Sequence, residues 1–208
     1  MELENIWEHY GTWWGVAFFI VLFGLFIAFT PFYKKSQRKS TSAYLAFVVA
    51  FAIEMHGIPF SMYLVSWIFG KELPEGIFWG HTLQQYIGHW GMYAAIVVFV
   101  IGFILVYFGW RNIYKNYWSK DEGKGKLVTN GIYAYIRHPQ YTGFLLISLG
   151  MIFEWATIPL IIMFPLMIML YYRLAKREEK DMEKEFGSEY VEYKKRTSMF
   201  LPSLKLSR

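Results

Sequence analysis

Long runs of apolar residues constrain the fold of this chain more than any other feature. They cover residues 12–33, 43–69, 93–110 and 143–172. Because a helix rises about 1.5 Å per residue, about 20 residues cross the roughly 30 Å hydrocarbon core of a bilayer. The last run is too long for one crossing and contains Glu154, which favours two helices with a turn there. The sequence therefore predicts an all-α integral membrane bundle of about five transmembrane helices, the last two forming a hairpin.

The composition agrees with a membrane protein. Apolar residues make up 55% of the 208 residues and aromatic residues 21%, which is too much for a soluble domain. We expect one membrane domain, with a three-helix part over residues 1–110 and a motif-bearing part over residues 111–208. The absence of cysteine excludes disulfides, thiolate nucleophiles and Cys-ligated metals. The acidic start, MELENIWEHY, does not have the pattern of a secretory signal, so no cleaved targeting segment is expected.

Basic residues are distributed unevenly between the apolar runs. If residues 34–40, residues 111–140 and the tail from Arg173 share one side of the membrane, that side holds 20 of the 21 Lys and Arg residues. The positive-inside rule then predicts a cytoplasmic C-terminus and an amino terminus outside. This orientation explains the basic loops, which face lipid headgroups, and a nucleic-acid partner is not expected.

Polar residues interrupt the second run at EMHGIP, residues 54–59. A carboxylate in mid-span costs about 2.5–3.5 kcal/mol on insertion scales, so Glu54 should face the protein interior or a cavity. Pro59 cannot donate a helical hydrogen bond, which predicts a kink beside Glu54 and His56. A polar substrate pocket and a buried pair that fixes helix packing explain the pattern equally well. A metal site that adds the histidines of residues 70–89 has no recognisable ligand spacing.

The most polar stretch between the apolar runs is residues 126–141, KLVTNGIYAYIRHPQY. Pro139 biases His138 away from the helical region, so the next helix should begin near Gln140. The unpaired amides and the positive dipole end of that helix then face the cytoplasmic surface, which suits a carboxylate or phosphate. On these residues alone, lipid contact by Arg137 and helix capping by His138 are an equally good explanation.

Charged residues return after Tyr172. Their density predicts that the last helix leaves the bilayer and continues along its surface to Gly187. A short helix over residues 189–195 would then lay Tyr190 and Tyr193 on the membrane interface.

Together, these pieces resemble the isoprenylcysteine carboxyl methyltransferase and phospholipid N-methyltransferase superfamily. The matching elements are LVTNGIY at residues 127–133, RHPQY at residues 137–141, the pair Glu178-Glu179, and FGSEY at residues 186–190. The resemblance covers roughly residues 111–202. It implies an enzyme that uses S-adenosylmethionine, bound in a cytoplasm-facing pocket between the motif loop and the last helix. A lipophilic or small apolar methyl acceptor would approach from the bilayer.

The resemblance also implies a set of site residues. The cofactor-binding set is Leu127, Val128, Gly131, Tyr133, Arg137, His138, Pro139, Tyr141, Glu178 and Glu179. Glu178 or Glu179 would bind the cofactor's ammonium, although pairing with lysines on a solvated helix face also explains this acidic pair. Arg173 would orient the substrate or the cofactor carboxylate. His138 would act as a base only for a nucleophile that carries a proton.

We therefore expect direct in-line methyl transfer to an isoprenylcysteine-like carboxylate, a lipid amine or a thiol, with Glu54 and His56 as tentative substrate residues. A membrane reductase that uses NADPH is an alternative, because sterol reductases carry a similar element, seen here as HPQYTG at residues 138–143. A non-catalytic membrane scaffold is a further alternative.

Overall fold

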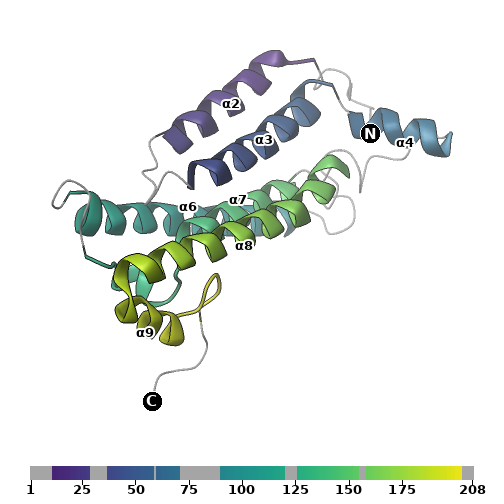
Figure 1. Cartoon of the computed structure of the whole chain (residues 1–208). Helices are drawn as coiled ribbons and strands as arrows, with labels where there is room; N and C mark the ends of the chain where they lie inside the picture. The colour runs from purple at the N-terminus through teal and green to yellow at the C-terminus, as the bar shows by residue number, and fades with distance from the viewer. Residues whose placement is uncertain are drawn as a thin grey trace. The chain divides into compact units, whose positions relative to one another are not determined.

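The computed structural model describes residues 11–28, 37–58, 60–70, 90–119, 126–154 and 158–202. Within these ranges the chain is helical, apart from turns, extended segments and one isolated bridge between Ile136 and Ser198. The all-α prediction is confirmed for these residues. The helices are α2 (Trp13–Ala28), α3 (Gln37–His56), α4 (Phe60–Phe69), α6 (Trp90–Ile113), α7 (Pro139–Glu154), α8 (Ile158–Phe186) and α9 (Ser188–Arg196) (Figure 1).

Among the described helices, two are long and apolar enough to cross a membrane. They comprise Trp90–Tyr117, in which α6 continues into a π-helical turn, and Pro159–Phe186 of α8. Their exposed side chains are those that hydrocarbon tolerates, among them Val97, Val100, Ile104, Ile162, Leu166 and Met169. The shorter apolar helices are Trp13–Leu25 and Ser42–His56, so the expectation of about five crossings stays a prediction.

The second apolar run differs from the prediction of one kinked helix. It forms two helices, because α3 ends at His56 and α4 begins only at Phe60. The Gly57 amide still donates to the carbonyl oxygen of Ile53 at 2.8 Å, and the helix stops there. A glycine followed closely by a proline is enough to end a helix, since both disfavour its interior. Pro59 itself lies outside the described residues.

The helix boundaries from α7 onward agree with the prediction. α7 ends at Glu154 and α8 begins at Ile158, close to the expected turn. α8 then continues through the charged residues to Phe186, and Gly187 follows it with a positive φ of 56°. One helix therefore carries both the apolar segment and the charged segment with Glu178 and Glu179.

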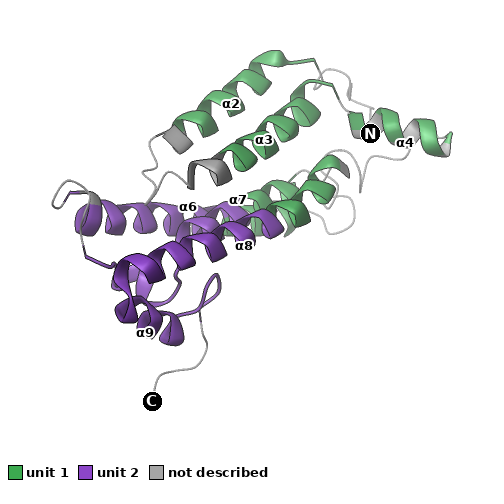
Figure 2. Ribbon diagram, in the orientation of Figure 1, with its two compact units in different colours: residues 1–29, 41–98, 148–167 green, residues 30–40, 99–147, 168–208 purple. Residues whose placement is uncertain are grey.

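The chain divides into two compact units, shown in green and purple in Figure 2. Unit 1 comprises residues 1–29, 41–98 and 148–167. In it α2 and α3 run side by side (Figure 1), and their aromatic side chains pack edge to face. The Phe19 and Phe51 rings lie 6.2 Å apart, and the Phe23 and Tyr44 rings 6.1 Å apart. Such contacts stabilise the pair beyond simple burial.

Unit 2 comprises residues 30–40, 99–147 and 168–208. In it α6 and α7 approach each other at Gly102 and Gly143, where neither helix has a side chain. A Cβ atom on Gly143 would lie 2.7 Å from the Gly102 carbonyl oxygen and 2.6 Å from Cγ2 of Val106. About two turns further along α6, a Cβ on Gly109 would lie 3.2 Å from Pro139. These glycines therefore let α7 pack closely against α6.

Replacing Gly143 by alanine is expected to lower the stability of the protein in detergent by about 1–3 kcal/mol, because the new methyl group overlaps backbone atoms of α6. Thermal unfolding measures the loss. Gly24→Ala is the matched control, since a Cβ there meets nothing within 4 Å and alanine is the better helix former. An equal or smaller loss at Gly143 than at Gly24 would contradict the close helix contact.

Candidate functional site

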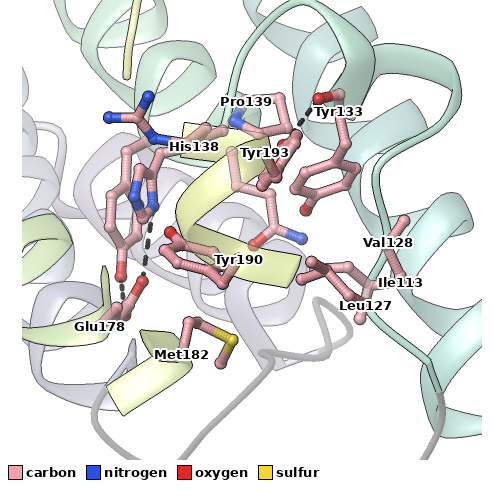
Figure 3. A pocket seen from close by; sticks show the side chains of 13 residues that line it. Ile113, Leu127, Val128, Tyr133, His138, Pro139, Glu178, Met182, Tyr190 and Tyr193 are labelled. Atoms are coloured by element: carbon pink, nitrogen blue, oxygen red, sulfur yellow. Dashed lines mark hydrogen bonds and ion pairs between the residues drawn. The ribbon is translucent and has the colours of Figure 1, made fainter. Parts of the chain in front are cut away.

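A pocket with about 510 Å³ of empty space, part of it open to solvent, lies within unit 2 (Figure 3). It is formed by the end of α6, the segment before α7, the first turn of α7, the charged part of α8, and α9. The lining residues are Ile113, Leu127, Val128, Tyr133, Arg137, His138, Pro139, Gln140, Tyr141, Glu178, Met182, Tyr190 and Tyr193.

The start of α7 places the polar residues at the pocket. Pro139 is the first helical residue, where a missing amide proton costs nothing. The carbonyl of His138 accepts a hydrogen bond from the Thr142 amide at 3.1 Å, which closes the first turn. The predicted helix start near Gln140 is therefore confirmed to within one residue.

His138, Tyr141 and Glu178 form the charged side of the pocket. The Tyr141 hydroxyl donates to Oε1 of Glu178, and Nδ1 of His138 lies 3.5 Å from Oε2 of Glu178. The His138 and Tyr141 rings stack, with centroids 5.5 Å apart. Burial favours a neutral imidazole, but Glu178 and Glu179 outweigh it, so the pKa of His138 is raised. The protonated form of His138 is thereby favoured.

Glu179 belongs to an ion cluster beside the pocket and is not among the lining residues. Its Oε1 accepts from Nε of Arg137 at 2.9 Å and lies 2.7 Å from Nη2 of the same guanidinium. Its Oε2 lies 3.2 Å from Nζ of Lys194. Nε2 of His138 is 3.6 Å from Oε1, close enough for charge attraction but not for a good hydrogen bond. Glu179 is only 1% exposed, so its charge is compensated inside the protein.

A C-terminal segment, residues 197–200, runs along the start of α7. The carbonyl of Ser198 accepts from the Arg137 amide at 2.9 Å, and that of Met199 accepts from the His138 amide at 3.1 Å. Arg137 reinforces this pairing, because its Nη1 donates to the carbonyls of Lys194 and Thr197. The guanidinium of Arg137 is thus used to join α8, α9 and the C-terminal segment.

Apolar and aromatic residues form the other side of the pocket. Ile113, Val128, Tyr133, Met182, Tyr190 and Tyr193 belong to one buried cluster. Burial raises the pKa of Tyr190 and of Tyr193, so both remain neutral phenols. The Tyr193 hydroxyl donates to the carbonyl of Tyr133 at 2.6 Å. The prediction that Tyr190 and Tyr193 lie on the membrane interface is therefore wrong, because α9 packs them inward, each with 3% exposure.

Most of the predicted cofactor-binding residues line this pocket; the exceptions are Gly131 and Glu179. Gly131 lies just before Tyr133 and has a φ of +59°. Arg173 lies on an exposed part of α8 and is not among the lining residues. Its predicted role in orienting substrate or cofactor stays a prediction.

The tentative substrate residues belong to unit 1. Glu54 is 3% exposed. The His56 ring stacks on Phe19 with centroids 5.4 Å apart, and a Cβ atom on Gly15 would lie 2.7 Å from it. This packing of His56 agrees with both expectations for Glu54 and His56, a packing role and a substrate pocket. Among the residues that the structure describes, no cluster of three metal-ligating side chains occurs, and His81 and His89 lie outside them.

Sequence reasoning did not select five of the lining residues as site residues: Ile113, Gln140, Met182, Tyr190 and Tyr193. Helical spacing offered a way to find one of them. Met182 follows Glu178 by four residues, so both lie on the same face of α8. Gln140 belongs to the RHPQY element at residues 137–141, but nothing in the sequence tells its orientation.

The phospholipid methyltransferase family matches residues 77–189 of this chain. Protein-S-isoprenylcysteine O-methyltransferase from Rattus norvegicus is 29% identical over 147 residues, which are 68% of this chain and 50% of the relative. Methanethiol S-methyltransferase from Crocosphaera subtropica is 26% identical over 159 residues, 69% of this chain and 58% of the relative. The chain thus spans about half the length of the curated relatives it matches.

Proposed function

The chain belongs to the phospholipid methyltransferase family and is a membrane protein, and from that premise we propose that it transfers the methyl group of S-adenosylmethionine to a lipophilic or small apolar acceptor. The observation that carries the proposal is the pocket, where the start of α7 and Glu178 of α8 line the same cavity. These are the two pieces that the family motif pairs. The names of the relatives support the acceptor class, since one is an isoprenylcysteine O-methyltransferase and another a methanethiol S-methyltransferase.

The residues of the pocket fit this cofactor. When bound, S-adenosylmethionine supplies a methyl group already activated by a sulfonium. Glu178 offers a buried carboxylate for the ammonium, and the first turn of α7 offers amide groups and a positive dipole end for the carboxylate. The wall of Ile113, Val128 and Met182 offers an apolar surface for the adenine. The charged groups and the adenine of S-adenosylmethionine would therefore each contact a complementary surface of the pocket.

Arg137 and Glu179 have a positioning role in this proposal. The guanidinium already makes bonds to Glu179, Lys194 and Thr197, so its remaining capacity for a ligand is small. It holds the His138 backbone in register with the C-terminal segment. Because Glu179 is already bound to Arg137, we assign the contact with the cofactor's ammonium to Glu178.

His138 lies between two carboxylates, with Nδ1 3.5 Å from Oε2 of Glu178 and Nε2 3.6 Å from Oε1 of Glu179. Its raised pKa favours the imidazolium, which must lose its proton before it can act as a general base. A carboxylate acceptor needs no base, whereas a thiol or an ammonium does. A thiol or an ammonium acceptor would therefore require His138 in its neutral form, whereas a carboxylate acceptor would not.

The proposal includes the topology derived from the basic residues. The N-terminus lies outside, about five helices cross the bilayer as a single membrane domain, and the pocket faces the cytoplasm. Glu54 and His56 remain candidates for contacting the acceptor.

Titration of the detergent-purified protein with S-adenosylhomocysteine tests the cofactor. Glu178→Gln is expected to weaken binding about 10- to 100-fold, because a charge-assisted contact is lost. Arg177→Gln, a change on the exposed part of α8, is the matched control, and Arg173→Gln separately tests the predicted role of that arginine. Absence of binding by folded protein, or binding of NADPH in its place, would overturn the proposal. A lipid extract incubated with a labelled methyl donor then identifies the acceptor.

A further inference from the structure

Gln140 is a buried polar residue whose Nε2 atom has no hydrogen-bond partner among the residues that the structure describes. Its side chain lines the pocket and the residue is only 3% exposed. A buried donor left unpaired is costly, and such groups are rare away from functional sites. An acceptor on a ligand in the pocket would satisfy this donor.

The stem of Gln140 places this amide on the α6 side of the pocket. A Cβ atom on Gly109 would lie only 3.1 Å from Cγ of Gln140, so this side chain packs directly against α6. Ile113 follows Gly109 by one helical turn on the same face and lines the pocket. Gln140 thus lies beside the apolar wall that Ile113 and Val128 form. His138 and Tyr141 interact with Glu178 on the charged side of the pocket.

The chemistry of a carboxamide selects among the groups of the ligand. An ammonium or a carboxylate is best held by charged groups or helix amides, which the other side supplies. A carboxamide presents a donor and an acceptor side by side, which match N7 and the N6 amino group of adenine. The flat faces of a purine also suit the apolar wall beside Gln140.

We propose that the Gln140 carboxamide binds the N6–N7 edge of the adenine of S-adenosylmethionine and so selects for a purine with an intact N7. The inference rests on the proposed function, since it assumes that this cofactor occupies the pocket. Gln140 acts here as a specificity residue that takes no part in methyl transfer.

Calorimetry with two ligands tests the assignment. S-adenosylhomocysteine carries N7, and S-tubercidinylhomocysteine replaces N7 by a CH group. The unmodified protein is expected to bind the first about tenfold more tightly, the effect of one buried hydrogen bond. Gln140→Met keeps the length of the side chain without its amide, and it should bind both ligands with equal affinity. Tyr190→Phe, another lining residue, should keep the tenfold preference.

Each outcome has a separate meaning. If the folded protein binds neither ligand, both the proposed function and this inference are overturned. If S-adenosylhomocysteine binds but the unmodified protein shows no preference, or if Gln140→Met keeps the preference, only this inference is overturned. Should Gln140→Met fail to fold in a thermal melt, Gln140→Glu replaces it. That variant keeps the size and one acceptor oxygen but removes the donor, and it too should lose the preference.

Discussion

Replacing Glu179 by alanine is expected to destabilise the protein by about 3–5 kcal/mol, the typical cost of breaking a buried ion pair. The variant would leave the guanidinium of Arg137, whose side chain is 8% exposed, without its counter-charge. It would also remove the carboxylate that lies 3.2 Å from Lys194. A thermal melt in detergent should show a fall of roughly 10 °C.

Glu183 provides the matched control. Its carboxylate lies 2.8 Å from the same Lys194 ammonium, but its side chain is 36% exposed. Glu183→Ala should therefore change stability by less than about 1 kcal/mol. Glu179→Gln separates charge from packing, since it keeps the volume and removes the negative charge. Similar melting temperatures for Glu179→Ala and Glu183→Ala would contradict the central position of Glu179 in the ion cluster.

Gly131→Ala is expected to destabilise the protein by about 2–4 kcal/mol. Its φ of +59° costs an L-residue about 1–2 kcal/mol. The added Cβ would also lie 2.1 Å from Nδ2 of Asn112, which donates to the Asn130 carbonyl at 3.1 Å. Either the side chain moves and that bond is lost, or the turn before Tyr133 shifts. Denaturation of the variant in detergent measures the sum of both effects.

Gly70→Ala isolates the backbone contribution. Gly70 has nearly the same φ, +60°, but a Cβ there meets nothing within 4 Å. We expect a loss of only about 1–2 kcal/mol at Gly70. Equal losses at the two glycines would show that Asn112 accommodates the extra atom freely.

The helices and the two sides of the pocket could be predicted because their determinants are local. Apolar run length fixed the long helices, Pro139 fixed the start of α7, and Gly187 fixed the end of α8. The break after His56 was predicted only as a kink, because the effect of a proline depends on whether neighbouring groups compensate for the lost hydrogen bond. Sequence pattern does not contain that information.

The orientation of α9 could not be predicted for a different reason. Tyr190 and Tyr193 are amphipathic and suit both a membrane interface and a protein interior. Their burial depends on residues far along the chain, since the Tyr193 hydroxyl bonds to the Tyr133 carbonyl. The roles of the adjacent Glu178 and Glu179 were likewise inseparable in sequence. Only the direction of each side chain from α8 distinguishes the pocket carboxylate from the ion-cluster carboxylate.

The pairing of residues 197–200 with the start of α7 has a consequence for biosynthesis. The backbone of His138 obtains its partner from Met199, and the Thr142 hydroxyl obtains its partner from Phe200. A ribosome makes these partners about sixty residues after the groups they bind, when the helices up to α8 have already been synthesised. The contacts that hold the start of α7 are therefore completed only after the C-terminal segment has been synthesised.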